Sequence, residues 1–171
     1  MSVGLDKNEF PGINLFDLTG RVAIITGGSK GLGLAMAAGL ASAGAHILLV
    51  NRNKEEGENA AKELANTYPI DAHFFQADVT QQVETEAMAA FAFKQWGRID
   101  ILINSAGINI RGAIDELSLE DFKQVMDVNV TGTWLSSRAV IPYMKKGKRG
   151  SIINLASALG TSRVPPMGYQ I

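Results

Sequence analysis

The chain has 171 residues, 46% of them hydrophobic and 19% charged, and its formal net charge is −1. A chain of this length can bury one substantial core, and its near-zero charge argues against nucleic acid or an anionic membrane as a partner, because both favour a strong basic excess. The absence of cysteine excludes disulfides, thiolate metal sites and cysteine nucleophiles, and with only two histidines, His46 and His73, no metal site is expected.

Residues 1–19 show no clear hydrophobic period, and we interpret them as an arm that leads into one domain over residues 20–171. The amino terminus lacks the basic-then-apolar order of a secretory signal. No apolar run approaches the roughly 18 residues that a membrane-spanning helix needs. We therefore expect a cytoplasmic protein.

Five short apolar runs, rich in β-branched residues, follow at residues 21–26, 46–51, 71–77, 98–104 and 151–156. Nearly continuous apolar character is typical of strands buried on both faces of a parallel sheet. Helical patterns occupy the intervals, at residues 31–43, 54–66, about 80–95 and about 118–146. Thr80 is predicted to cap the third helix, and Ser118 with Asp121 resembles a capping box for the fourth. This alternation predicts a doubly wound α/β fold with a parallel, Rossmann-type sheet.

The first apolar run continues directly into the sequence TGGSKGLG, residues 26–33, and then into an alanine-rich helix. Glycines in this position let the backbone turn sharply and approach a pyrophosphate, while the helix amino terminus offers unpaired N–H groups to it. Glycines also serve simple tight turns in proteins that bind no nucleotide. The loop by itself therefore leaves both interpretations open.

The spacing T-G-x-x-x-G-x-G resembles that of the short-chain dehydrogenase/reductase family. Other motifs of that family follow in the expected order, namely ADVT at 77–80, NSAG at 104–107, Asn129 in DVNVTG, Ser157 in NLASALG, and Tyr169. The resemblance covers nearly the whole chain from about Leu18. It departs from the family pattern at Ser105, where the family commonly repeats asparagine.

The resemblance implies a nicotinamide dinucleotide as cofactor. The residues implied to shape its site are Gly27, Ser29, Gly31, Leu32, Gly33, Asp78, Val79, Asn104, Ala106 and Gly107. Two of them have a simpler alternative, since Asp78 is also suited to a turn at a helix entry and Asn104 to a cap at a strand end.

The end of the second predicted strand carries Asn51 and Arg52. An acidic residue in this place would bind the ribose 2′-hydroxyl of NAD(H) and repel the 2′-phosphate of NADP(H). A neutral amide removes the repulsion, and a guanidinium can pair with a phosphate. Lys30 adds a second cation. We therefore predict NADP(H), with NAD(H) possible; the alternative is that both cations are ordinary solvated side chains.

The resemblance also implies that Tyr169 is the proton donor, that Ser157 holds the substrate oxygen, and that Asn129 helps to hold a water chain. A tyrosine with a pKa of about 10 needs a nearby cation to work near neutral pH, and in this family a lysine four residues after the tyrosine supplies it. This chain ends two residues after Tyr169, and eleven residues separate Ser157 from Tyr169, one fewer than the family pattern predicts. We therefore expect an enzyme interrupted at its catalytic tyrosine, with a sheet incomplete at the carboxyl-terminal end.

The implied activity is the interconversion of a ketone and a secondary alcohol. Asn109 and Arg111, in the loop after the fourth predicted strand, favour a sugar acid, a polyol or a 3-oxoacyl compound as substrate, although loops are commonly polar without a ligand. The resemblance further implies a homo-oligomer through the helix at 118–146. The absent lysine leaves open a catalytically silent domain that binds a nucleotide or a partner, and the glycine loop leaves open a structural protein that binds no dinucleotide.

Overall fold

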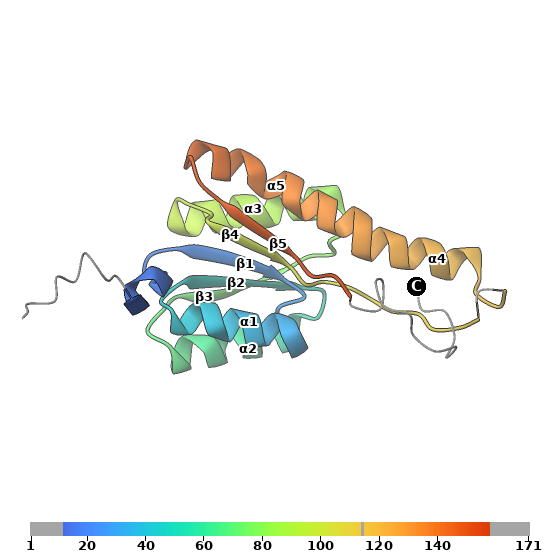
Figure 1. Ribbon diagram of the computed structural model, residues 1–171, viewed down its shortest axis with the longest axis horizontal. Coiled ribbons are helices and arrows are strands. Elements are labelled where there is room, and N and C mark those ends of the chain that lie inside the picture. The colour runs from blue at the N-terminus through green and yellow to red at the C-terminus, as the bar shows by residue number, and fades with distance from the viewer. Residues whose placement is uncertain (1–11, 114, 158–171) are drawn as a thin grey trace, which may run out of the picture.

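The computed structural model describes residues 12–113 and 115–157. Its centre is a five-stranded parallel sheet with the strand order β3-β2-β1-β4-β5 (Figure 1). The strands are β1 (Val22–Thr26), β2 (His46–Asn51), β3 (Ala72–Gln76), β4 (Ile101–Asn104) and β5 (Ser151–Asn154). The predicted doubly wound α/β fold is confirmed.

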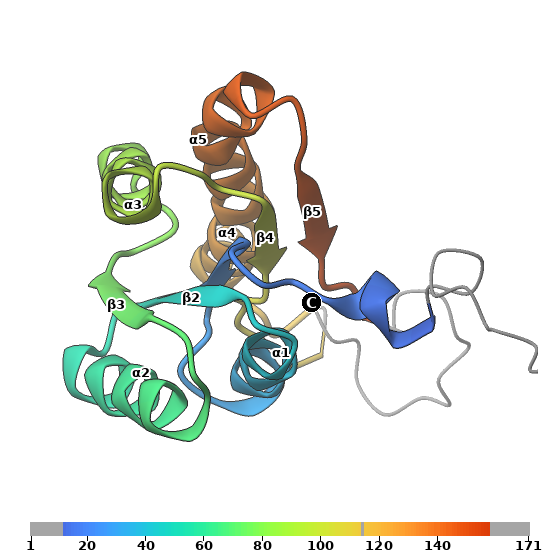
Figure 2. The ribbon, with the colours of Figure 1, turned by 90° about the vertical axis from the view of Figure 1, so that its left-hand side faces the viewer.

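Helices cover both faces of this sheet, as Figure 2 shows. One face packs against α1 (Gly31–Ser42) and α2 (Lys54–Thr67), and the other against α3 (Gln82–Trp96) and α5 (Gly132–Lys146). Side chains alternate between the faces of a strand, so Ile25 of β1 belongs to the core under α1 and α2, whereas Ile24 belongs to the core under α3 and α5. Burial on both sides explains why β1, β2 and β4 are almost entirely apolar. The edge strands β3 and β5 are partly exposed and carry polar residues as well.

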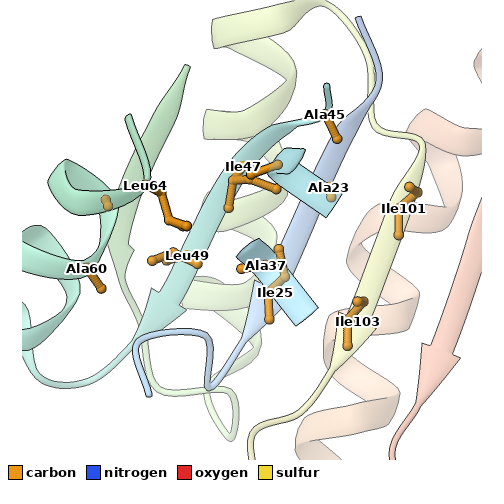
Figure 3. Packing of buried hydrophobic residues seen from close by; sticks show 12 residues of the cluster. Ala23, Ile25, Ala37, Ala45, Ile47, Leu49, Ala60, Leu64, Ile101 and Ile103 are labelled. Atoms are coloured by element: carbon orange, nitrogen blue, oxygen red, sulfur yellow. The ribbon is translucent and has the colours of Figure 1, made fainter. Parts of the chain in front are cut away.

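The core under α1 and α2 relies on small helix residues (Figure 3). Ala37 of α1 and Ala60 of α2 are buried, and Leu64 of α2 lies with them against Ile47 and Leu49 of β2. Alanine has no side chain beyond Cβ, so these helices can lie close to the sheet. The helix that follows the glycine loop is therefore held firmly on the strand that precedes the loop.

The predicted helix at 118–146 is a continuous helical run in three parts. It begins with α4 (Leu119–Met126), passes through the π-helical segment η2 (Asp127–Thr131), and continues as α5. The predicted capping box is present, because the Ser118 hydroxyl oxygen accepts the Asp121 N–H at 3.0 Å and an Asp121 carboxylate oxygen accepts the Ser118 N–H at 3.2 Å. The π-helical segment was not predicted; such segments frequently occur at functional sites.

The cap of the third helix was predicted wrongly. Helix α3 begins at Gln82 with Gln81 as its N-cap, not Thr80. Thr80 instead donates its N–H and its hydroxyl to the same Asp78 carboxylate oxygen, at 2.9 and 2.8 Å. The short side chain of Asp78 thus organises a turn before the helix, and Thr80 belongs to that turn.

Strand β1 lies in the middle of the sheet, and the chain builds outward from it first through β2 and β3 and then through β4 and β5. The reversal between β1 and β4 is a topological switch point, and open α/β sheets bind ligands beyond the carboxyl ends of strands at such points. Thr26 and Asn104 are register partners at this end of the two strands. A ligand site is therefore expected around Thr26 and Asn104.

Among the described residues, none of the helices combines the length and the apolarity that crossing a bilayer requires. Within the same ranges, no three histidine, aspartate or glutamate side chains gather into a possible metal site. The 3₁₀ helix η1 (Gly12–Phe16) lies in the predicted arm, and Leu18 after it packs against the core under α1 and α2. The domain boundary near residue 20 stays a prediction.

Candidate active site

The glycine loop between β1 and α1 is packed backbone against backbone. Gly27 has a φ of +64°, and a Cβ placed on it would lie 2.8 Å from the backbone of Ala106. A Cβ placed on Gly33, in the first turn of α1, would overlap the carbonyl oxygen of Gly27. Side chains are thus excluded at both positions, and the loop, the helix and the segment after β4 meet at van der Waals distance.

The amino terminus of α1 is not capped by its own N-cap residue. Lys30 occupies the N-cap with extended backbone and makes no side-chain cap hydrogen bond. Gly31 and Leu32 form the start of the helix, and the side chain of Leu32 is 72% exposed. The first-turn N–H groups, with the positive end of the helix dipole, are suited to an anion such as a diphosphate.

Thr26 joins the glycine loop to the segment after β4, a role that the sequence did not reveal. Its buried hydroxyl oxygen accepts the N–H groups of Ser105 and Ala106 at 3.3 and 3.2 Å. The predicted NSAG segment is thereby fixed beside the loop. The available signal was that Thr26 opens the motif T-G-x-x-x-G-x-G, but threonine at that point is equally typical of a strand end.

Asn104 links three elements at the same edge. Its buried amide donates to the carbonyl oxygen of the Asn154 side chain at 2.8 Å and to the hydroxyl of Ser137 at 3.0 Å, and so ties β4 to β5 and α5. Its own Oδ1 is buried without a hydrogen-bond partner in the part of the chain that the structure describes. The strand-end role that the sequence allowed is present, and the unpaired oxygen remains an acceptor. Neither Asn154 nor Ser137 was predicted to belong to the site.

A row of polar side chains runs from β2 across the glycine loop to α2. The Asn51 amide nitrogen donates to the hydroxyl oxygen of Ser29, and the Ser29 hydroxyl donates to the Glu56 carboxylate at 2.9 Å. The Lys30 ammonium lies 3.5 Å from the other oxygen of Glu56. Asn51 Oδ1 is buried without a partner among the described residues. The structure thus unites Ser29, Lys30 and Asn51 around Glu56, which the sequence pattern assigned only to the helix predicted at residues 54–66.

Arg52 and Asp78 face each other across the ends of β2 and β3. The guanidinium of Arg52 is 4.0 Å from the carboxylate of Asp78, whose other oxygen holds the turn at Thr80. Val79 is buried, and a Cβ on Gly132 of α5 would lie 2.6 Å from its side chain. The turn role of Asp78 is therefore real, and it also brings a carboxylate beside Arg52.

Asn129 lies in η2 and holds the loop that follows β4. Its Oδ1 accepts the Ile108 N–H and its Nδ2 donates to the Ile108 carbonyl oxygen, both at 2.9 Å. A Cβ on Gly107 would come within 3.3 Å of Asn129 Oδ1, which is tighter than most such contacts. The structure thus brings Asn129 and Gly107 together, and Asn129 positions a backbone segment.

The remaining predicted site residues are placed only in part. Ser157 follows β5 and is exposed. Tyr169 lies outside the described residues, so its distance from Ser157 is not defined. Asn109 and Arg111 are exposed in the loop after β4.

These groups fit a nicotinamide dinucleotide. The glycine loop leaves no side chain between its backbone and a diphosphate, and the start of α1 supplies N–H donors. The unpaired buried oxygens of Asn51 and Asn104 lie on strands at either side of β1. Buried acceptors without partners are uncommon in folded proteins and call for an explanation; these two lie beside the switch point, where a ligand is expected.

Known proteins resemble this chain in sequence and in fold. A sequence model of the short chain dehydrogenase family matches residues 21–169. The D-threitol dehydrogenase of Mycolicibacterium smegmatis is 38% identical over 147 residues, which cover 85% of this chain and 56% of that protein. The 3-alpha-(or 20-beta)-hydroxysteroid dehydrogenase of Mycobacterium bovis is 36% identical over 143 residues, covering 84% and 54%.

Solved structures agree with the sequence matches. The crystal structure of a short-chain type dehydrogenase/reductase from Mycobacterium marinum has a TM-score of 0.85 at 35% identity, over 90% of this chain and 62% of that one. The chain spans a little more than half the length of the curated relatives named above. With the family match over residues 21–169 and these relatives, the chain belongs to the short-chain dehydrogenase/reductase family.

Proposed function

We propose that the protein is an oxidoreductase that uses a nicotinamide dinucleotide to interconvert a ketone and a secondary alcohol. The observation that carries this proposal is the exclusion of side chains at Gly27 and Gly33, beside an α1 amino terminus without a side-chain cap from Lys30. Such an arrangement serves a diphosphate. Calorimetric titration with NADPH and NADH tests it, and no heat of binding at millimolar concentration of either would contradict it.

The residues at the carboxyl ends of the strands have distinct roles in this proposal. The α1 N–H groups bind the diphosphate with Ser29 beside it, Asp78 and Val79 border the adenine, and the backbone from Asn104 to Gly107 borders a ribose. The nicotinamide ring, when bound, donates or accepts the hydride. Ser157 holds the substrate oxygen and Tyr169 moves the proton to or from it. Asn129 keeps the loop at Ile108 in place through its two hydrogen bonds.

We further propose a preference for NADP(H). Asn51 brings no negative charge to the end of β2, and the side chains of Lys30 and Arg52 are 80% and 67% exposed. Their ion pairs, at 3.5 and 4.0 Å, are of the exposed kind that contributes about 1 kcal/mol or less, so a phosphate can replace the carboxylates. Dissociation constants measured for both dinucleotides provide the test, and tighter binding of NADH would overturn the preference.

The substrate class is proposed as a sugar acid, a polyol or a 3-oxoacyl compound. Exposed polar residues in the loop after β4, Asn109 and Arg111, support a hydroxylated or carboxylated compound. The name of the relative D-threitol dehydrogenase supports the polyol class. Assays of the full chain with a panel of polyols, sugar acids and keto compounds would decide, and turnover confined to apolar ketones would exclude all three classes.

A homo-oligomer through the helical run at 118–146 is also proposed. Large apolar side chains are exposed along that run at helical spacing: Leu119, Phe122, Met126, Val130, Trp134 and Ile141. A contiguous apolar stripe of this kind marks an interaction surface. The substitution Trp134→Glu should lower the mass found by sedimentation equilibrium, whereas an unchanged mass would argue against this surface. The predicted cytoplasmic location stays a prediction.

A further inference from the structure

Glu56 is the one acidic group that contacts both Ser29 and Lys30 among the hydrogen bonds and ion pairs of the described residues. It lies in the first turn of α2, where Asn53 caps the helix and accepts the Glu56 N–H at 3.2 Å. Its side chain is 30% exposed, against 80% for Lys30. The Glu56 carboxylate is therefore partly buried against α2, whereas the Lys30 ammonium lies largely in solvent.

The carboxylate also decides the direction of the hydrogen bonds beside it. An ionised carboxylate only accepts hydrogen bonds, so the Ser29 hydroxyl must donate to Glu56. The Ser29 oxygen is then left to accept, and it receives the amide N–H of Asn51. Asn51 Oδ1 consequently turns away from Ser29 and is the atom that remains buried without a partner in the described part of the chain.

Both effects oppose an additional phosphate. A 2′-phosphate at the end of β2 would find the Lys30 charge already balanced by Glu56, and it would find the amide nitrogen of Asn51 already donating to Ser29. A ribose 2′-hydroxyl, which is neutral and can donate, meets neither obstacle. The partial burial of Glu56 reduces the screening of its charge by solvent.

We propose that Glu56 is a specificity-determining residue that weakens binding of the 2′-phosphate and so limits the preference for NADP(H) over NAD(H). This inference rests on the proposed function, because it requires a nicotinamide dinucleotide at this edge of the sheet. It concerns the ratio of the two affinities, whichever cofactor the protein binds more tightly.

The test compares Glu56→Gln with the matched control Glu55→Gln in the full chain. Both glutamates belong to the first turn of α2 and both changes remove one negative charge, but Glu55 is exposed. Calorimetry should show that Glu56→Gln tightens NADPH binding about threefold to fivefold, the upper part of the range that an exposed ion pair is worth. NADH binding should change less than about twofold, because Gln keeps an acceptor for Ser29.

Salt and the control separate this role from a merely structural one. The gain in NADPH affinity should shrink as ionic strength rises from about 0.05 to 0.5 M, because screening weakens a charge effect. Equal changes for NADPH and NADH, a gain that salt does not alter, or the same gain in Glu55→Gln would overturn the inference. If the wild-type protein binds neither dinucleotide, the proposed function fails and this inference fails with it. If both dinucleotides bind but Glu56→Gln leaves the ratio of NADPH to NADH affinity unchanged, only the inference fails.

Discussion

Polar groups are paired differently at the two ends of the parallel strands. We call the end where the strands begin the amino edge of the sheet and the end where they finish the carboxyl edge. At the amino edge, the buried Asp100 carboxylate accepts the Val22 N–H at 3.0 Å, two Arg98 nitrogens at 2.6 and 2.7 Å, and an Arg21 nitrogen at 3.3 Å. At the carboxyl edge, the buried oxygens of Asn51 and Asn104 have no partner in the described residues. The carboxylate at the amino edge is thus fully hydrogen-bonded, whereas two buried acceptors at the carboxyl edge have no partner among the described residues.

The two ends of strand β1 show the same difference. Val22, at its start, is tied to a carboxylate that also holds two arginines, while Thr26, at its end, uses its hydroxyl to fix the backbone beside the glycine loop. Hydrogen bonds to a buried carboxylate stabilise a fold, and open α/β sheets bind ligands beyond the carboxyl ends of their strands. The amino edge should therefore determine stability and the carboxyl edge binding, and changes made at each edge can test that division.

The largest effect on stability is expected from Asp100→Asn. The amide cannot hold the charges of Arg98 and Arg21. These arginines are partly exposed, so the loss is that of charge-assisted hydrogen bonds to a buried group and should lower the free energy of unfolding by about 2 kcal/mol. Urea denaturation measures this loss, and dinucleotide affinity should not change. Asp71→Asn is the control, because that carboxylate is 65% exposed and its loss should cost less than about 0.5 kcal/mol. Similar losses for both variants would contradict a special role for the amino edge.

The same carboxylate predicts how stability depends on pH. Burial raises the pKa of Asp100, but hydrogen bonds from Arg98 and from the Val22 N–H, with the Arg98 charge, hold that pKa below its ordinary value of 3.8. A lowered folded-state pKa contributes stability that is complete above the ordinary value and is lost as pH falls through the folded-state value. The difference in urea midpoint between wild type and Asp100→Asn should therefore be constant from pH 7 to about 5 and shrink below about pH 4. A constant difference down to pH 3 would contradict this origin.

The next effect belongs to the carboxyl edge and should appear in binding. In Gly33→Ala, the new methyl group overlaps the Gly27 carbonyl oxygen, so the loop must move. Overpacking of this kind typically costs about 1–3 kcal/mol. Because the strain falls on the loop proposed to contact the diphosphate, we expect dinucleotide binding about fivefold to 150-fold weaker by calorimetry.

Gly39→Ala is the matched control for that change. Gly39 lies in the same helix, and a Cβ there meets nothing within 4 Å. This variant should bind the dinucleotide normally and gain roughly 0.5–1 kcal/mol in stability, because alanine favours a helix more than glycine does. Weaker binding in both variants would mean that α1 as a whole, rather than the contact at Gly33, governs the site.

The sequence predicted the fold well and the carboxyl edge only in part. Apolar runs and glycine spacing are local features of the sequence, so the strands, the helices and the loop at 26–33 could be predicted from them. The partners of those residues were not, because Glu56 meets Ser29, and Asn154 meets Asn104, only after distant segments pack together. Thr80 shows that a local signal can also mislead. Threonine is a good helix cap, but here its N–H and its hydroxyl both donate to the nearby carboxylate of Asp78.

The smallest predicted effect tests whether hydrogen bonds at the carboxyl edge act on a segment rather than on the whole fold. Asn129→Ala removes both hydrogen bonds to Ile108, and each is worth about 1 kcal/mol where it is made. The Ile108 amide should exchange with solvent roughly tenfold faster by NMR, while the free energy of unfolding changes by less than about 0.5 kcal/mol, because the exposed loop opens independently of the core.

Asn129→Asp distinguishes the two bonds, since a carboxylate still accepts the Ile108 N–H but cannot donate to its carbonyl oxygen. Its exchange rate should fall between those of wild type and Asn129→Ala. Unchanged exchange in both variants would show that the loop is held by other contacts. Global destabilisation equal to that of Asp100→Asn would show instead that both edges of the sheet support the fold, and the division between a stabilising edge and a binding edge would fail.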